Sequence, residues 1–117
     1  MTWFDDICDR DSPQTTNAYG LKSSFVTTGY LRVYGFTVYN SKTSAQYILV
    51  FDASSLPIDT KVPLFALPVA ASSQVSAYYG APGRIFRQGL VLCNSSTDTT
   101  KTIGSADCFF DVQYDNI

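Results

Sequence analysis

Residues 106–114 read Ala-Asp-Cys-Phe-Phe-Asp-Val-Gln-Tyr, and their pattern decides the fold class. Every second side chain from Ala106 to Tyr114 is apolar, and the positions between them hold two Asp and one Gln beside Phe109. A period of two is typical of a β-strand, in which successive side chains point to opposite faces of a sheet. One face of this strand is therefore predicted to line a core, and the other to be largely polar.

Similar segments precede this strand at intervals of about ten residues, and turn-forming residues separate them. The predicted strands are a short one at 25–26 and longer ones at 30–40, 45–52, 62–69, 74–79 and 84–93. About seven strands with such spacing, and no strong helical period, predict one all-β domain, either a barrel or an antiparallel β-sandwich. The long polar loop at 94–104 suits a sandwich with Greek-key or jelly-roll-like connections.

The predicted strand 30–40 changes phase at its middle. Leu31 and Val33 share one face, whereas Phe36 and Val38 share the other. An extra, bulged residue at Gly35 brings both pairs to the core, and glycine is common at such bulges. The predicted core contains these four side chains together with Leu49, Phe51, Leu90, Leu92, Phe110 and Val112.

Two other strands carry signals about their place in the sheet. Residues 47–51 (Tyr-Ile-Leu-Val-Phe) are apolar on both faces, whereas an antiparallel strand normally has one polar face. Two explanations are open for the second apolar face of this run. A loop covers it, or a second subunit packs against it and contacts residues from Tyr47 onward. Pro63 and Pro68 cannot donate ladder hydrogen bonds, so the segment 62–69 is predicted to lie at a sheet edge.

Residues 1–22 show no sustained period and are predicted to form an extended N-terminal arm, with the sandwich domain spanning 23–117. The arm contains Trp3, Phe4 and Ile7. Burial of such side chains stabilises a complex by about 1.5–3 kcal/mol each. These three residues are therefore predicted to bind a partner, while the aspartates of the arm pair with basic groups. An arm folded over its own sandwich is the alternative.

The composition excludes several classes of protein. Histidine is absent, which removes Ser-His-Asp and Cys-His catalysis and most transition-metal sites. The net charge is −2 without a Lys/Arg cluster, so we expect no nucleic-acid binding. No apolar run approaches the about 20 residues of a membrane span, and the N-terminus lacks the features of a signal peptide. The chain is predicted to be made and kept in a cytoplasm and to be no enzyme.

The remaining chemical candidates favour structural roles. Cys93 and Cys108 lack the CxxC spacing of zinc sites and fall in predicted core strands, and a bridge between them stays open. The aspartates of the arm lack the glycine and distal glutamate of an EF-hand calcium loop. Asp107 and Asp111 share a strand face. They could act as a carboxylate pair in glycoside hydrolysis, but we prefer the explanation that charges beside a sheet edge discourage aggregation. We expect no catalytic residue, no metal and no cofactor.

The segment 78–84 (Tyr-Tyr-Gly-Ala-Pro-Gly-Arg) places aromatic rings and an arginine around a tight turn. Tyr and Arg are enriched among the residues that dominate interface energetics. Tyr78, Tyr79 and Arg84 are therefore candidate partner-binding residues, and a carbohydrate is one ligand that aromatic platforms bind. A plain hairpin turn with half-buried tyrosines is the structural alternative.

Residues 92–97 (Leu-Cys-Asn-Ser-Ser-Thr) and 101–114, which end in the strand quoted above, look like the C-terminal end of small phage-encoded proteins. Residues 33–40 and 47–57 resemble the same group, so the resemblance covers roughly 30–114 and omits the arm. It implies a β-sandwich virion protein of a tailed phage, of the capsid-decorating (cement) or tail-associated kind. No catalytic residue is carried over.

For a capsid-decorating protein, the resemblance implies the major capsid protein as partner and a homo-oligomer, with a trimer favoured. It also implies a place in the phage particle after synthesis in the host cytoplasm. The mechanism is added interface area without chemistry, repeated over the shell. The alternative is a tail- or fibre-associated module that binds another tail protein or a host-surface carbohydrate.

Overall fold

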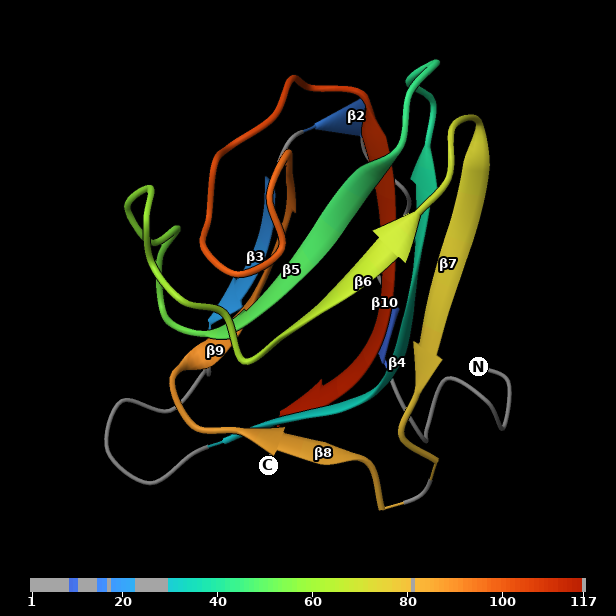
Figure 1. Cartoon of the computed structure of the whole chain (residues 1–117). Coiled ribbons are helices and arrows are strands. Elements are labelled where there is room, and N and C mark those ends of the chain that lie inside the picture. Colours follow the sequence, from blue (N-terminus) through green and yellow to red (C-terminus); the bar gives the residue numbers. More distant parts are fainter. Residues whose placement is uncertain (1–8, 11–14, 17, 23–29, 81, 117) are drawn as a thin grey trace.

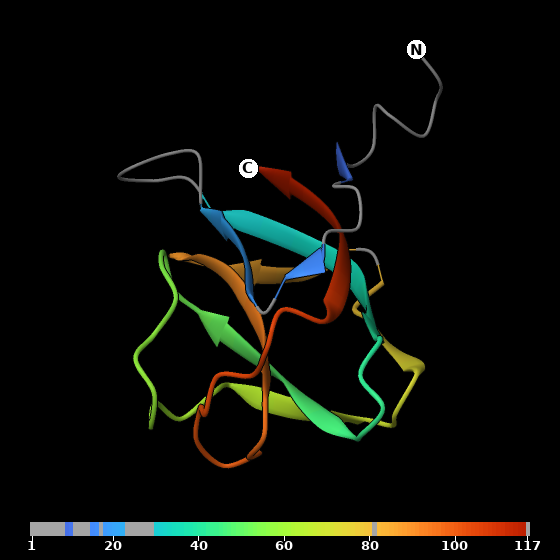
Figure 2. The ribbon, with the colours of Figure 1, turned by 90° about the horizontal axis from the view of Figure 1, so that it is seen from above.

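The chain folds into two antiparallel β-sheets that stack face to face, as Figures 1 and 2 show. The computed structural model describes residues 9–10, 15–16, 18–22, 30–80 and 82–116, and no helix occurs among them. The predicted all-β sandwich is thus confirmed. Its strands are β1 (Asp9–Arg10), β2 (Thr15–Thr16), β3 (Ala18–Lys22), β4 (Leu31–Asn40), β5 (Gln46–Asp52), β6 (Phe65–Val69), β7 (Ser73–Tyr78), β8 (Arg84–Phe86), β9 (Gly89–Ser95) and β10 (Cys108–Asn116).

The strand order is that of a jelly roll. The first sheet has the order β1-β10-β4-β7, with β2 also on β10 and β8 also on β4, and the second has the order β3-β9-β5-β6. β1 and β2 follow one another along β10, and β7 and β8 follow one another along β4. If each of these pairs counts as one interrupted strand, each sheet has four strands. A sandwich of eight strands in two Greek keys is a jelly roll.

The turn at 80–83 does not reverse the chain. β7 and β8 are both antiparallel to β4, so the chain continues in one direction past a loop that interrupts a single edge strand. The hairpin alternative for this segment is therefore wrong. Gly80 and Gly83 have positive φ angles of 67° and 81°, which glycine adopts without steric cost.

The chain changes sheets between β8 and β9. The sequence predicted one kinked strand over 84–93, but β8 pairs with β4 and β9 pairs with β5 in the other sheet. At the crossing, the Asp52 carboxylate accepts hydrogen bonds from the backbone N–H groups of Arg87, Gln88 and Gly89 at 3.1, 2.9 and 3.4 Å. Gly89 has a φ of 144°, which a side chain rarely allows.

The predicted bulge in β4 is confirmed. Gln113 of β10 pairs with Gly35 and Tyr114 pairs with Val33, so β4 has one extra residue at this point. The shift places Leu31, Val33, Phe36 and Val38 in the core between the sheets with no exposed surface. Leu90, Leu92, Phe110 and Val112 belong to the same core, as the sequence predicted.

Leu49 and Phe51 are buried, but they do not lie between the sheets. Together with Val91 and Cys93 they form a second cluster, on the outer side of the β5–β9 pair. Ile103 from the polar loop and Ala53 from the β5–β6 connection pack against this cluster. Among the two explanations for the apolar run in β5, the structure supports the covering loop. β6, which contains Pro68, lies at the sheet edge as predicted.

The described parts of the predicted arm pair with the sandwich. β1 and β2 extend the first sheet beside β10, and β3 forms the edge of the second sheet beside β9. Trp3, Phe4 and Ile7 lie outside the described residues, as does the short strand predicted at 25–26. The boundary between an arm and a domain at residue 22 stays a prediction.

We expect Gly35→Ala to lower the free energy of unfolding by about 1–3 kcal/mol, because an added side chain overpacks the bulge. Its Cβ would lie 2.8 Å from the carbonyl oxygen of Ala77 and 3.0 Å from Cδ1 of Tyr78. Gly20→Ala is the matched control, since its nearest neighbours would be 3.8 Å away. Urea unfolding of both variants measures the difference, and equal effects would contradict this account of the bulge.

Candidate partner-binding surface

The two thiols that the structure describes, Cys93 and Cys108, are poor nucleophiles. Cys93 belongs to the outer cluster and Cys108 to the core between the sheets, and both are free. Burial raises the pKa of Cys93 to about 11 and that of Cys108 to about 12. Because the thiolate is the reactive species, both groups are inert near neutral pH. Among the described residues, no three His, Cys, Asp or Glu side chains lie close enough together to hold a metal ion.

Asp107 belongs to a hydrogen-bonded network that joins the two sheets. Its Oδ1 accepts from Gln46 Nε2 at 2.8 Å and from Asn94 Nδ2 at 3.2 Å. Gln46 Nε2 also donates to Asn40 Oδ1, and Asn94 Nδ2 donates to Gln46 Oε1. The three amide residues are buried. These hydrogen bonds link the buried amides and fix the ends of β4, β5 and β9, although Asn94 Oδ1 is buried without a hydrogen-bond partner.

The electrostatics of Asp107 do not suit a general acid. Burial favours a higher pKa, but hydrogen bonds from Ser105 and Gln46 and the charge of Lys42 hold the pKa of Asp107 below its ordinary value. A glycosidase acid requires a raised pKa. The geometry therefore supports a structural role for this carboxylate.

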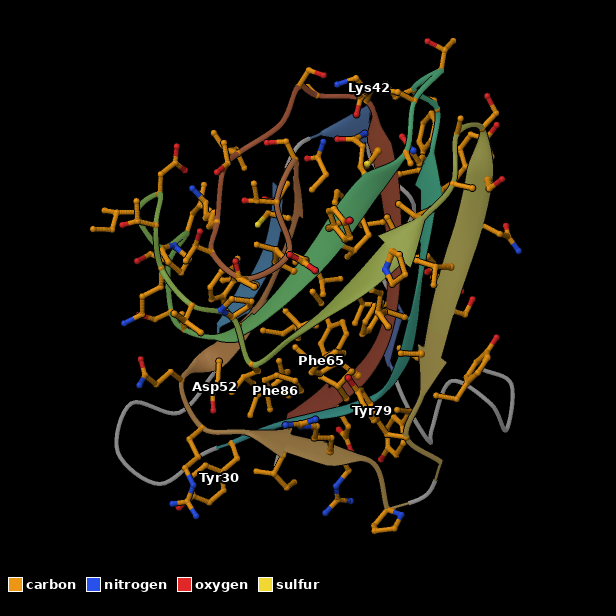
Figure 3. The ribbon with its side chains drawn as sticks, viewed as in Figure 1. Tyr30, Lys42, Asp52, Phe65, Tyr79 and Phe86 are labelled. Atoms are coloured by element: carbon orange, nitrogen blue, oxygen red, sulfur yellow. The ribbon has the colours of Figure 1, made fainter. Side chains whose placement is uncertain are left out.

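The predicted aromatic loop is only partly available to a partner. Tyr78 is 77% exposed, whereas Tyr79 is half-buried against the core. The Arg84 guanidinium lies over the rings of Phe65, Phe86 and Tyr79, at 5.3, 5.7 and 5.8 Å from their centroids. Figure 3 labels these three rings, which lie close together between β6 and β8. Arg84 is exposed, but its guanidinium interacts with its own domain through cation–π contacts, and Tyr78 is the exposed ring of the loop.

The other predicted residues are spread over the molecule. Tyr47 is half-buried beside the outer cluster on β5 of the second sheet, whereas Tyr78 lies on β7 of the first sheet. The structure does not bring Tyr47 and the 78–84 loop into one site. Partner binding by each of these residues stays a prediction.

The outer face of the first sheet is an aromatic surface that no described segment covers. Tyr39 on β4 and Phe109 on β10 are directly paired, each is 37% exposed, and their ring centroids are 6.2 Å apart. Tyr78 and Ile85 add exposed apolar area farther along, where Ile85 is 42% exposed. We call these four residues the aromatic face. The outer side of the second sheet, by contrast, is covered by its own loops.

A second apolar surface lies on the β5–β6 connection, residues 53–64. Ile58, Val62, Leu64 and Leu56 are 78%, 67%, 52% and 44% exposed. The sequence analysis predicted residues 62–64 as the start of an edge strand and predicted no surface in this segment. Four large aliphatic side chains in a segment without strand alternation were the signal that pointed to a surface.

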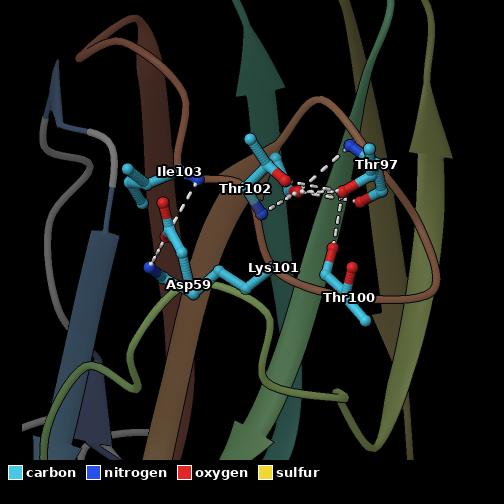
Figure 4. Close-up of polar contacts among 7 residues, drawn as sticks. Asp59, Thr97, Thr100, Lys101, Thr102 and Ile103 are labelled. Carbon is cyan, nitrogen blue, oxygen red and sulfur yellow. Dashed lines mark hydrogen bonds and ion pairs between the residues drawn. The ribbon is translucent and has the colours of Figure 1, made fainter.

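The β5–β6 connection is held in place by the β9–β10 connection, residues 96–107, which contains most of the predicted polar loop. Thr60 N–H donates to the Lys101 carbonyl at 2.7 Å, and Lys101 N–H donates to the Lys61 carbonyl at 2.8 Å. Asp59 forms an ion pair with the buried ammonium of Lys101 and accepts from Ile103 N–H, as Figure 4 shows. Thr60 has a φ of 77°, an uncommon value outside glycine. The exposed side chains are thus presented on a fixed backbone.

Comparisons with known proteins give little direct guidance. No family model and no curated protein matches this chain. Among solved structures, the coat protein of Tobacco streak virus is similar, with 11% identity, a TM-score of 0.40, and coverage of 91% of this chain and 83% of that chain. A likeness this distant does not define a function. Within the described residues, no helix is long and apolar enough to cross a membrane.

We expect Asp107→Asn to lower the free energy of unfolding by about 1 kcal/mol at pH 7, because the amide cannot accept all the hydrogen bonds of the carboxylate. The pKa of Asp107 is lowered by folding, so its contribution is present above the unfolded value of about 3.9 and is lost as the pH falls through the folded value. The difference from wild type should therefore shrink below about pH 4. Urea unfolding at several pH values tests this, with Asp98→Asn in the exposed loop as control.

Proposed function

We propose that this chain is a structural protein of a virus particle, and more specifically a capsid-decorating protein of a tailed phage. The observation that carries the proposal is the aromatic face, a sheet surface that no described segment covers, on a sandwich whose other sheet is covered by its own loops. Its partner is the major capsid protein of the shell. The resemblance of residues 30–114 to small phage-encoded proteins supports the same assignment.

The aromatic face has the composition of a protein–protein contact. Tyr and Phe are enriched in the buried centres of interfaces, and a flat face of paired strands offers area without a cleft. A stable contact buries about 800 Å² on each partner. Binding to many equivalent positions on one shell reinforces modest individual contacts. The jelly-roll strand order occurs in viral capsid domains, although a fold alone assigns no function.

Carbohydrate or tail-protein binding is the second candidate, and the exposure of Tyr78 favours it. Aromatic rings that project from a rigid sandwich stack on sugar faces. Against this candidate, Arg84 lies over Phe65 and Tyr79 within its own domain. Screening the protein against a glycan array, with Tyr78→Ala as control, distinguishes the two candidates.

We expect the double variant Tyr39→Ser/Phe109→Ser to bind DNA-free capsids of the phage that encodes this chain at least about tenfold more weakly than wild type. The reason is that each ring contributes about 1.5 kcal/mol or more when it is buried in a contact. Co-sedimentation with the capsids measures the bound fraction, and electron microscopy of decorated shells locates it.

The matched control is Tyr30→Ser, because Tyr30 is also 37% exposed but lies beside Arg87 at the end of the sandwich. Thermal unfolding shows whether the double variant is folded. Undiminished binding by a folded double variant contradicts the assignment of the aromatic face to the shell contact.

A further inference from the structure

We propose that β7 pairs in antiparallel orientation with β7 of a second copy of this chain, so that the first sheets of two copies join into one continuous sheet. This inference goes beyond the proposed function, since it concerns a contact between copies and not a contact with a shell. It rests on the directions of the backbone groups along β7, on the side chains of the strand and on the charge of the sequence around it.

β7 is an edge strand with one free side. It ends the strand order of the first sheet, and among the described residues β4 is the strand that pairs with it. Figure 1 shows no described segment beyond β7 on its other side. The edge of a sheet presents a row of backbone N–H and C=O groups without ladder partners, and such a row is a template for pairing with another chain.

The backbone groups that point away from β4 belong to every second residue of β7. The Tyr79 N–H donates to the Tyr34 carbonyl of β4 at 2.8 Å. The carbonyl oxygen of Ala77 also points to β4, since it would lie 2.8 Å from a Cβ added at Gly35. The odd-numbered residues therefore direct their N–H and C=O groups to β4. Because these directions alternate along an antiparallel strand, the outward groups are those of Gln74, Ser76 and Tyr78.

The spacing of these outward groups is symmetric about Ser76, and this symmetry fits a second copy of the same strand. In antiparallel pairing about a two-fold axis, Ser76 lies opposite Ser76 of the second copy, and Gln74 lies opposite its Tyr78. Residues that are opposite in this way exchange both of their N–H···O bonds, so each outward N–H meets an outward C=O. A two-fold contact uses the same surface on both copies and is closed, so it needs no further partner.

The side chains of β7 suit the same pairing. Val75 and Ala77 pack against the core but are only partly buried. In the paired strands Val75 lies opposite Ala77 of the second copy, and their remaining apolar surface is removed from water. On the outer side, Tyr78 is 77% exposed and Gln74 is exposed. Pairing places each tyrosine beside a glutamine of the other copy, and contacts between side chains on opposite strands stabilise a sheet.

β7 lacks the features that normally keep a sheet edge from pairing. Natural edge strands are protected by proline, by charged side chains or by bulges. Pro68 lies in β6, an edge of the second sheet, whereas β7 contains no proline, no charge and no bulge in its pairing with β4. The sequence from Val62 to Gly83 contains no Asp, Glu, Lys or Arg. Two copies can therefore approach through β7 without repulsion between like charges, although each chain has a net charge of −2.

The experiment measures self-association of the full chain by sedimentation, without any capsid. We expect a reversible equilibrium between monomer and dimer. Ser76→Pro removes the outward N–H and leaves the hydrogen bonds to β4 in place, and proline is tolerated at such edge positions. It should weaken dimerisation at least about tenfold, because the two-fold axis removes the donor from both copies. Thermal unfolding shows whether the variant is folded.

A pair of charged variants tests the two-fold axis directly. Ser76→Lys and Ser76→Asp each place two like charges opposite one another, so each variant alone should dimerise about threefold to tenfold more weakly than wild type. An equimolar mixture of the two should recover at least the wild-type association, because opposite charges then face each other. Ser96→Lys, on the exposed β9–β10 connection, is the matched control and should leave association unchanged.

Three results would overturn the proposal. They are a chain that stays monomeric up to about 1 mM, a trimer or larger closed assembly in place of a dimer, and a mixture of the two charged variants that associates no better than either variant alone. A chain that dimerises as expected but does not bind capsids would overturn only the proposed function. A chain that binds capsids but stays monomeric would overturn only this inference.

Discussion

The pairing of β4 with β10 is the constraint on which the rest of the structure depends. This ladder runs the full length of both strands, from Leu31 beside Asn116 to Asn40 beside Cys108. A strand of this length keeps one face toward the core only if its side-chain alternation stays in register. The bulge at Gly35 restores that register where the sequence changes phase, and it therefore decides which side chains are left on the opposite face. The core and the aromatic face are two consequences of the same pairing.

The outer faces of the two sheets differ in how far neighbouring loops cover them. The outer side of the second sheet is apolar, and Ile103 and Ala53 from neighbouring connections cover it. The outer side of the first sheet keeps Tyr39 and Phe109 partly exposed. Within the residues that the structure describes, connecting loops cover the second sheet, whereas these two rings of the first sheet keep exposed surface.

Local signals were enough to predict most of the strands from β4 onward, the bulge and most of the core, but not β1, β2 and β3 within the predicted arm. The alternation in 106–114 and the phase change around Gly35 are encoded by neighbouring residues, so they are readable without tertiary information. Leu49 and Phe51 show the limit of this reasoning. Their burial is readable, but the side of the sheet on which they are buried depends on where the loop carrying Ile103 lies.

The crossing between the sheets was not predictable for the same reason. Residues 84–93 carry one continuous strand signal, yet the chain passes from one sheet to the other within it. The acceptor that fixes this crossing is Asp52, which is far away in sequence. The candidate site followed the same rule. Tyr78 was predicted to bind a partner, and the structure shows that it is exposed, whereas the cation–π contacts between Arg84 and Phe65 on β6 are long-range and were missed.

The two apolar surfaces, the aromatic face and the β5–β6 connection, lie on different sides of the sandwich. The aromatic face belongs to the first sheet, and the β5–β6 connection lies on the outer side of the second, so the surfaces point in different directions. A ligand on one surface does not occlude the other. The backbone of the connection is fixed by Lys101 and its neighbours, and the aromatic face is fixed by the core beneath it. Neither surface must reorganise to bind. Under the proposed function, a shell bound at the aromatic face leaves the β5–β6 connection open to solvent.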